Sequence, residues 1–534
     1  MSDGVRRRHL LKRASIGVLA GIGSSNAVAA KRNDRSQPAN VDTNQIIETT
    51  AGWNQLAKLA ADDGSRLDQF GLSVATSGDG TSAIVGAPND EGGSAYVFTP
   101  SSEGWEQQAK LVADDVDGGD EFGSSVDISK DGTTAIIGAR SDEDPNGPSA
   151  GSAYVFSSAG GDWDQQAKIV AEDGDSDDLF GWSVDLSDDG TVAIIGAHND
   201  DDPNGTTGDE DDTYGGAGSA YVFSRTDESW NQQSKIFAED GDPDDNFGAS
   251  VSISGDGTTA LVGANVDEDP NGPSAGSAYV FSSSGGNWEQ QDKLTAEDGD
   301  SSDNFGISLD IDANGTTALI GAGLDENLNG ELAGSGYVFA SSGGNWTQQT
   351  KLLADDGGSF DRFGISVSIS GDGTTAVVGS YGDPESPGIA YAFSSAGENW
   401  EQQAKFNAAD GDSDDSFGSY ISLSDDGSVA IVGAYEDSDA NGYRSGSAYV
   451  FGTSESDSDR IQVPGASGPA KDIDGDTLLE DVNGDGDSDL FDALSYYNNR
   501  NSQAIQSNPD KFDFDGDGTA GTLFDALQLY NEIS

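Results

Sequence analysis

Hydrophobic and polar residues alternate along short segments of this chain. Between 105 and 111 every second residue (Trp, Gln, Ala, Leu) shares one face, and the same alternation runs from 122 to 128. A period of two residues is typical of a β-strand with one buried face, whereas an unbroken apolar run such as 135–137 is typical of a strand buried on both faces. With 152–156 as a further apolar segment, the pattern predicts four short strands in this stretch.

The same pattern occurs seven times. Each copy has an Asp-Gly or Asn-Gly pair between its second and third strands and opens with a Trp, at Trp53, Trp105, Trp163, Trp230, Trp288, Trp346 and Trp400. Asp-Gly and Asn-Gly accept the positive φ angles of tight hairpins. A four-stranded unit cannot bury its own faces, but units stacked around an axis do so and lose most free edges. We therefore expect an all-β, seven-bladed propeller of four-stranded blades over residues 51–453, with a linear solenoid as the alternative.

Two dipeptides also recur, represented by Phe122-Gly123 and Gly138-Ala139, with Phe70-Gly71 and Gly86-Ala87-Pro88 as the fullest pair. On these motifs the chain resembles the FG-GAP repeat family, which includes the propellers of integrin α-subunits. The resemblance implies that each Phe-Gly strand is innermost and that the Trp53 strand completes the last blade, which closes the ring. The Asp-rich calcium loop of that family is replaced here by the short hairpin, so those ion sites are not carried over.

One face of the expected propeller collects acidic loops. The loop before each Phe-Gly strand has an Asp two residues before the Phe, which we interpret as a turn-former. The loop after Gly-Ala has the pattern D-x-[DN]-x-N-G in five copies, and its possible weak calcium ligands include Asp142, Asp144, Asn146, Asp267, Asp269 and Asn271. Because no carboxylate follows at the twelfth position, solvated turns are the favoured alternative. A protein or polysaccharide ligand of the propeller is expected on this variable face.

A Ser/Gly/Pro linker at 454–470 leads to two related acidic loops. The first places ligands at calcium-loop positions 1, 3, 5, 7, 9 and 12, with Asp481, Asn483, Asp485, Asp487, Asp489 and Asp492. The second is expected to bulge or bind more weakly, because its last carboxylate comes one place late; its ligands are Asp513, Asp515, Asp517, Thr519 and Asp525.

An apolar pattern at i, i+1, i+4 and i+7 follows each loop and predicts two α-helices that pack on each other. Two such EF-hand-like loop-helix units resemble a dockerin. The resemblance implies that residues 471–534 form a small α-helical Ca²⁺-binding module that docks to a cohesin-like or other surface protein. Because the ion neutralises packed carboxylates, this module should fold only with calcium.

Composition narrows the possible functions. The chain has 96 Asp and Glu against 25 Lys and Arg, and its formal charge of −71 opposes binding to nucleic acids and anionic membranes. Such charge is tolerated where salt screens it, so we expect a halophilic, haloarchaeal source. The chain has no Cys, and His198 is the one His outside the leader. Disulfides and thiol nucleophiles are therefore excluded, and Ser-His-Asp catalysis and His-rich zinc sites nearly so.

The first 30 residues resemble a twin-arginine export signal, with Arg7-Arg8 before a Gly/Ala-rich stretch that ends in small residues. Residues 31–50 form a linker, and no later segment reaches the roughly 20 apolar residues of a transmembrane helix. We therefore expect a secreted or cell-surface protein.

The sequence favours a non-enzymatic binding or adhesion protein. A glycoside hydrolase or lyase on a propeller scaffold is the first alternative, since two carboxylates suffice for glycoside hydrolysis. A structural cell-surface protein is the second.

Overall fold

The computed structural model describes residues 52–453, apart from 102–103, 144–145, 202–215, 227–228, 269–270, 383–385 and 398. The predicted signal (1–30), the two linkers (31–50 and 454–470) and the predicted calcium module (471–534) lie outside the described residues. Among the described residues, no helix has the length and apolarity that crossing a membrane requires.

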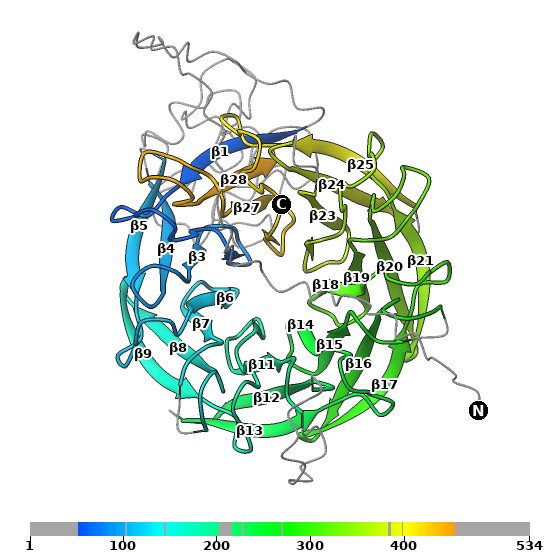
Figure 1. Ribbon diagram of the computed structural model, residues 1–534, viewed down its shortest axis with the longest axis horizontal. Coiled ribbons are helices and arrows are strands. Elements are labelled where there is room, and N and C mark those ends of the chain that lie inside the picture. Colours follow the sequence, from blue (N-terminus) through cyan, green and yellow to red (C-terminus); the bar gives the residue numbers. More distant parts are fainter. Residues whose placement is uncertain are drawn as a thin grey trace, which may run out of the picture. The chain divides into compact units, whose positions relative to one another are not determined.

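The described chain forms seven four-stranded sheets, arranged as blades around a central channel (Figure 1). This confirms the predicted seven-bladed propeller. The innermost strands of blades 1 to 7 are β2 (Ser73–Thr76), β6 (Phe122–Ile128), β10 (Ser183–Leu186), β14 (Phe247–Ile253), β18 (Phe305–Ile311), β22 (Val367–Ile369) and β26 (Ile421–Leu423). The second strands are β3 (Ala83–Ala87), β7 (Thr134–Ala139), β11 (Val192–Ala197), β15 (Thr259–Ala264), β19 (Thr317–Ala322), β23 (Thr375–Ser380) and β27 (Val429–Ala434).

The third strands are β4 (Ser94–Ser101), β8 (Ser152–Ala159), β12 (Ser219–Thr226), β16 (Ser277–Ser284), β20 (Ser335–Ser342), β24 (Ile389–Ala396) and β28 (Ser447–Thr453). The outermost strands are β5 (Gly104–Leu111), β9 (Asp162–Ile169), β13 (Ser229–Ile236), β17 (Asn287–Leu294), β21 (Asn345–Leu352), β25 (Asn399–Phe406) and, in blade 7, β1 (Trp53–Leu59). Neighbouring strands within each blade are antiparallel, as in blade 2.

The first strand of the chain closes the ring. β1 pairs antiparallel with β28, from Trp53 opposite Thr453 to Leu59 opposite Ala448. The order of the last sheet is therefore β1-β28-β27-β26, and one blade contains strands from both ends of the described chain (Figure 1). This confirms the closure that the Trp53 segment predicted.

Burial follows the hydrophobic pattern of each strand. All six residues of β7 are buried, as expected of an unbroken apolar run with a blade packed on each side. The outermost strand β9 alternates between exposed and partly buried positions, because one of its faces meets solvent. The Phe of each Phe-Gly pair packs against two aromatic rings of its own blade. Phe122 meets both of its partners edge-on, 5.4 Å from Tyr154 and 6.0 Å from Phe156, centroid to centroid.

The glycines of the Phe-Gly and Gly-Ala pairs allow adjacent blades to approach each other closely. A Cβ on Gly86 of blade 1 would overlap the carbonyl oxygen of Gly123 in blade 2, and a Cβ on Gly123 would overlap the carbonyl oxygen of Ser94. Gly123 also has a φ of 90°, a conformation that favours glycine. The same overlap recurs around the ring, with Gly321 against Gly364 in blades 5 and 6. The Phe-Gly and Gly-Ala motifs therefore set the spacing of the blades around the channel.

Candidate functional site

A ring of backbone hydrogen bonds surrounds the channel at the end where the Asp-Gly hairpins lie. We call this ring the hairpin girdle; its members are Gly78, Lys130, Asp188, Gly255, Ala313, Gly371 and Asp425. From Gly78 to Gly371, each N–H donates to the carbonyl of the next member at 3.0 or 3.1 Å. The N–H of Asp426 completes the ring by donating to the carbonyl of Gly78 at 3.4 Å. Lys130 adds ion pairs with Asp188 (3.1 Å) and Asp425 (2.7 Å).

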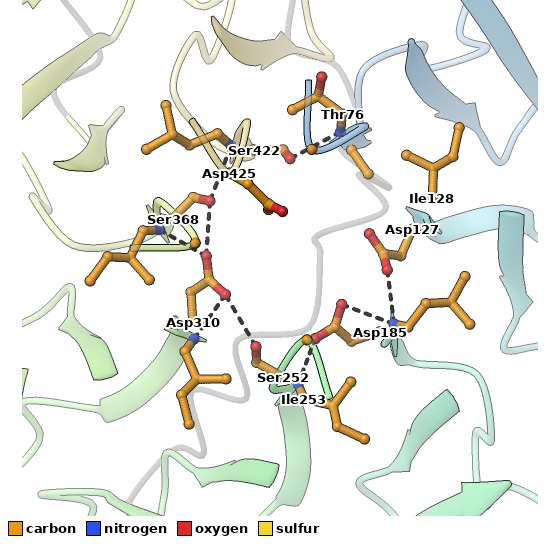
Figure 2. A pocket seen from close by; sticks show the side chains of 18 of the residues that line it. Thr76, Asp127, Ile128, Asp185, Ser252, Ile253, Asp310, Ser368, Ser422 and Asp425 are labelled. Carbon is orange, nitrogen blue, oxygen red and sulfur yellow. Dashed lines mark hydrogen bonds between the residues drawn. The ribbon is translucent and has the colours of Figure 1, made fainter. Parts of the chain in front are cut away.

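Next to the girdle, the inner strands surround a polar cavity of about 220 Å³. One residue of each inner strand occupies the same place in the repeat and lines this cavity: Ala75, Asp127, Asp185, Ser252, Asp310, Ser368 and Ser422. Figure 2 labels all of these residues except Ala75 and shows their side chains around the opening, with hydrogen bonds running from blade to blade. Asp127, Asp185 and Asp310 therefore bring three carboxyl groups to the channel wall.

These side chains cap the edges of the inner strands. An inner strand has no neighbour toward the channel, so some of its N–H groups need another acceptor. In five junctions the side chain of one blade accepts an N–H of the next: Asp127 from Leu186 (2.8 Å), Asp185 from Ile253 (2.6 Å), Asp310 from Ile369 (2.8 Å), Ser368 from Leu423 (3.1 Å) and Ser422 from Thr76 (3.1 Å). The cavity wall is thus a set of links between blades.

The three carboxyl groups titrate well above the usual range. Burial raises the pKa of Asp127 to about 6 and that of Asp310 to about 7. Burial, followed by the charge of Asp127, raises the pKa of Asp185 well above its ordinary value. A site of this kind holds protons near neutral pH.

A second repeated arrangement lies on the opposite face, which we call the loop face; it carries the loops before the Phe-Gly strands and after the Gly-Ala strands. In blade 4 the ammonium group of Lys293 lies 2.7 Å from both Asp240 and Asp267. The hydroxyl of Tyr279 donates to the same two carboxylates at 3.0 Å. Burial and the two carboxylates raise the pKa of Tyr279 above its usual range. Equivalent lysines that bridge two aspartates are Lys58, Lys110, Lys168, Lys235 and Lys351.

These clusters contain two of the possible calcium ligands of the propeller. Asp142 lies 2.7 Å from the Lys168 ammonium group, and Asp267 contacts Lys293 in the same way. Asn146 donates its side-chain amide to the carbonyl of Ala171 at 2.9 Å, and Asn271 to that of Ala296 at 2.8 Å. Asp144 and Asp269 lie outside the described residues. A lysine already neutralises the first carboxylate of each loop, so each loop has less negative charge with which to bind an ion. Calcium binding at these loops stays a prediction.

The Asp before each Phe holds its own turn, and in six of the seven blades it is buried. Asp178 accepts the N–H of Asp175 at 2.7 Å, and Asp245 accepts that of Asp242 at 2.7 Å. Burial raises the pKa of Asp245 to about 7, and burial together with Asp200 raises the pKa of Asp178 to about 8. Carboxylate oxygens of Asp178, Asp200 and Asp201 lie within 4.8 Å of one another, but Lys235 pairs with Asp200 at 2.8 Å. This geometry agrees with the turn-forming interpretation.

The seven repeats differ in sequence at the loop-face end of the channel, which we call the mouth. The residue after each Gly-Ala or Gly-Ser pair varies widely: Pro88, Arg140, His198, Asn265, Gly323, Tyr381 and Tyr435. So does the second residue after each Phe: Leu72, Ser124, Trp182, Ala249, Ile307, Ile365 and Ser419. The third is Ser in six blades and Tyr420 in blade 7. Trp182, Tyr381, Tyr420 and Tyr435 therefore stand outside the repeated aromatic positions.

These unusual residues contact one another. The guanidinium carbon of Arg140 lies 4.5 Å from the ring centroid of Trp182, and the Trp182 and His198 centroids are 4.0 Å apart. Glu121 pairs with Arg140 at 2.6 Å. Burial, helped by the charge of Arg140, lowers the pKa of His198 to about 4, so its imidazole is neutral at neutral pH.

Unsatisfied polar atoms also lie at the mouth. Within the described part of the protein, His198 Nδ1, Asn265 Oδ1 and Ser419 Oγ are buried without a hydrogen-bond partner. Burial, followed by the effect of Tyr381, raises the pKa of Tyr420, while the positive charge of Arg140 opposes that rise. The mouth thus combines aromatic rings, a guanidinium group and polar atoms able to accept or donate further hydrogen bonds.

A family model described as "FG-GAP repeat" matches residues 53–98, 105–156, 163–223, 230–281, 288–339, 346–393 and 400–451. The chain belongs to the FG-GAP repeat family. Its seven FG-GAP matches coincide with the seven Trp-initiated repeats, and together they span most of the chain. No curated protein matches the chain. Among solved structures, hydrazine synthase of Kuenenia stuttgartiensis has a TM-score of 0.45 and 12% identity, over 70% of this chain and 94% of that one.

Sequence reasoning found the FG-GAP framework but missed most of its functional positions. Trp182 and His198 stand out in the sequence as the off-register Trp and the remaining His, yet nothing in their spacing places them together. Asp127, Asp185 and Asp310 were not predicted, although an Asp inside an inner strand is a usable signal. The predicted ligands from Asp481 to Asp492 and from Asp513 to Asp525 lie outside the described residues.

Proposed function

We propose that this chain is an exported binding protein, in which the mouth of the FG-GAP propeller holds a protein or polysaccharide ligand. The observation that carries the proposal is the concentration of Trp182, His198, Arg140 and Tyr420 at the mouth of an otherwise regular scaffold. Trp, Tyr and Arg are the residues enriched at binding hot spots. FG-GAP propellers commonly serve as binding or adhesion scaffolds, and the absence of a membrane-spanning helix among the described residues is compatible with a secreted or surface location.

The equivalent positions of other blades suggest substitutions that remove the mouth side chains of Trp182 and Tyr420 without disturbing the fold. Trp182→Ala introduces the residue that blade 4 has at this place, and Tyr420→Ser introduces the residue of the other six blades. In blade 1 that Ser donates to the carbonyl of Gly123 at 2.8 Å, so the new side chain has a partner available. The double variant should therefore fold like the parent.

We expect the double variant to bind its ligand at least about 30-fold more weakly, because loss of a hot-spot residue costs about 2 kcal/mol or more. The exported protein would be tested against immobilised neutral and acidic polysaccharides and candidate surface proteins in high salt. Lys130→Ala, at the opposite end of the channel, is the matched control and should bind normally. Equal affinity of the parent and the double variant would refute the mouth as the binding site, and release of reducing ends from a polysaccharide would favour the enzymatic alternative.

The second part of the proposal is that residues 471–534 bind calcium and dock to a cohesin-like or other surface protein. Its support is the ligand spacing from Asp481 to Asp492 and the related loop from Asp513 to Asp525. We expect the full chain to melt in two steps, with only the lower step dependent on calcium. At a calcium concentration 100 times the Kd, the bound ion stabilises the module by about 2.7 kcal/mol.

Asp492→Asn removes the twelfth-position carboxylate and should abolish one calcium site, whereas Asp525→Asn should have a smaller effect. Titration calorimetry would give the stoichiometry, with two ions per chain expected. More than two ions would place calcium in the propeller loops that contain Asp142 and Asp267, and Asp142→Asn would then lower the count. No binding by the full chain would contradict the calcium assignment.

A further inference from the structure

Side chains in the channel link the inner strands of five blades. Asp127 and Asp185 both accept the N–H of Leu186, at 2.8 and 3.0 Å, so their carboxyl groups lie next to each other. Asp185 also accepts the N–H of Ile253, and Asp310 accepts that of Ile369. Ser252 donates to Asp310 at 3.1 Å, and Ser368 donates to the same carboxyl group at 2.9 Å. These bonds join β6, β10, β14, β18 and β22 along the cavity wall (Figure 2).

The adjacent carboxyl groups of Asp127 and Asp185 require a proton. Two carboxylates side by side in a confined cavity repel each other, which disfavours the doubly ionised pair. Asp127 and Asp185 therefore share a proton, which also lets one carboxyl group donate a hydrogen bond to the other.

We propose that Asp127, Asp185, Ser252, Asp310 and Ser368 form a proton-holding clasp, which fastens the inner strands of blades 2 to 6 and is released at alkaline pH. The clasp goes beyond the proposed binding function, because it lies at the hairpin end of the channel and involves no ligand. It makes the propeller responsive to the pH of its surroundings.

Among the described residues, Lys130 is the one cation that lines the cavity, and it pairs with other carboxylates than those of Asp127 and Asp185. Its partners Asp188 and Asp425 also line the cavity, and all three belong to the hairpin girdle. The inner strands β2, β14, β22 and β26 contribute no ionisable side chain to the lining. The negative charge of Asp310 raises the pKa of Asp127, and the negative charge of Asp185 raises the pKa of Asp310. Loss of the protons would therefore leave mutually repelling charges in a confined space.

The direction of the pH effect follows from where the protons are held. Unfolded aspartates titrate with a pKa of about 3.9. The folded protein keeps the protons until the pH passes about 6 for Asp127 and about 7 for Asp310. Stability from the clasp is therefore complete below about pH 4 and is lost as the pH rises through the folded pKa values.

Asp185→Asn provides the decisive variant, because its amide can donate a hydrogen to Asp127 at any pH while its oxygen still accepts the N–H of Ile253. We expect this variant to bind about one fewer proton per folded molecule near pH 6 and to melt at a higher temperature than the parent at pH 9. Melting curves from pH 5 to pH 9 at one salt concentration would measure both slopes.

The control is Asp188→Asn, three residues further along the same blade, which should keep the parent's pH dependence. A second measurement is the infrared difference spectrum between the parent and Asp185→Asn at pH 6, which should contain the band of a protonated carboxyl group; the bands of Asp178 and Asp245 cancel because both proteins have them. A difference spectrum without that band, or an Asp185→Asn variant with the parent's pH slope, would overturn the clasp.

Discussion

Gly321→Ala is expected to destabilise the propeller by about 3 kcal/mol, the upper part of the range for an overpacked core. Gly321 lies in β19 with a φ outside the left-handed region, so alanine fits the strand itself. The cost comes from the junction, because the new Cβ would overlap the carbonyl oxygen of Gly364 in the next blade. Backbone cannot move aside as a side chain can, and blades 5 and 6 must separate. Urea unfolding followed by tryptophan fluorescence would measure the loss.

Gly118→Ala is the matched control. No atom lies within 4 Å of the Cβ that this substitution would add, and Gly118 has no left-handed φ. Its effect should stay within about 0.5 kcal/mol, as for most surface substitutions. If the two variants unfold at the same urea concentration, the glycine contact does not determine blade spacing.

Trp53→Ala should be the most damaging tryptophan substitution, with a loss of about 3 to 5 kcal/mol. Trp53 is 3% exposed, stacks on Phe406 at 5.6 Å and belongs to the strand that closes the ring. Losing it weakens the contact between the two ends of the propeller chain. Because β1 is joined to blade 7 through pairing with β28 alone, and not through a hairpin, packing must hold it there.

Trp163→Ala tests the same residue type at the equivalent place in blade 2. Trp163 is only partly buried, and a hairpin connects its strand β9 to β8. A cost of roughly half that of Trp53→Ala is expected, in proportion to the smaller buried area. Equal losses in the two variants, measured by thermal unfolding, would show that ring closure does not depend on Trp53.

The framework was predictable because local signals agree with each other. The two-residue period, the Asp-Gly pairs and the seven Trp segments all specify strands and hairpins, and the repetition itself implies a closed ring. The Phe-Gly and Gly-Ala pairs carry the family resemblance, and that resemblance predicted the order of the strands within a blade. Even the pairing of β1 with β28 followed, since otherwise one blade would lack its outer strand.

The sites were harder to predict because they depend on contacts between distant residues. Alternation shows that Asp127 and Val126 lie on opposite faces of a strand, but not which face meets the channel. The Lys293 cluster joins Asp240 and Asp267 from two different loops, and no spacing rule links them. The sequence pattern around Asp142 is shared by calcium loops and by hydrogen-bonded turns, and it does not reveal that Lys168 pairs with Asp142.

The hairpin girdle has a consequence for how such a protein diversifies. Its links use backbone N–H and carbonyl groups, and its members include glycine, lysine, aspartate and alanine. Apart from proline, which lacks the N–H, any residue could take part. A duplicated blade would therefore inherit its connection to its neighbours whatever its side chains became. Mutation could remodel the mouth of one blade while the opposite end of the ring stayed fastened.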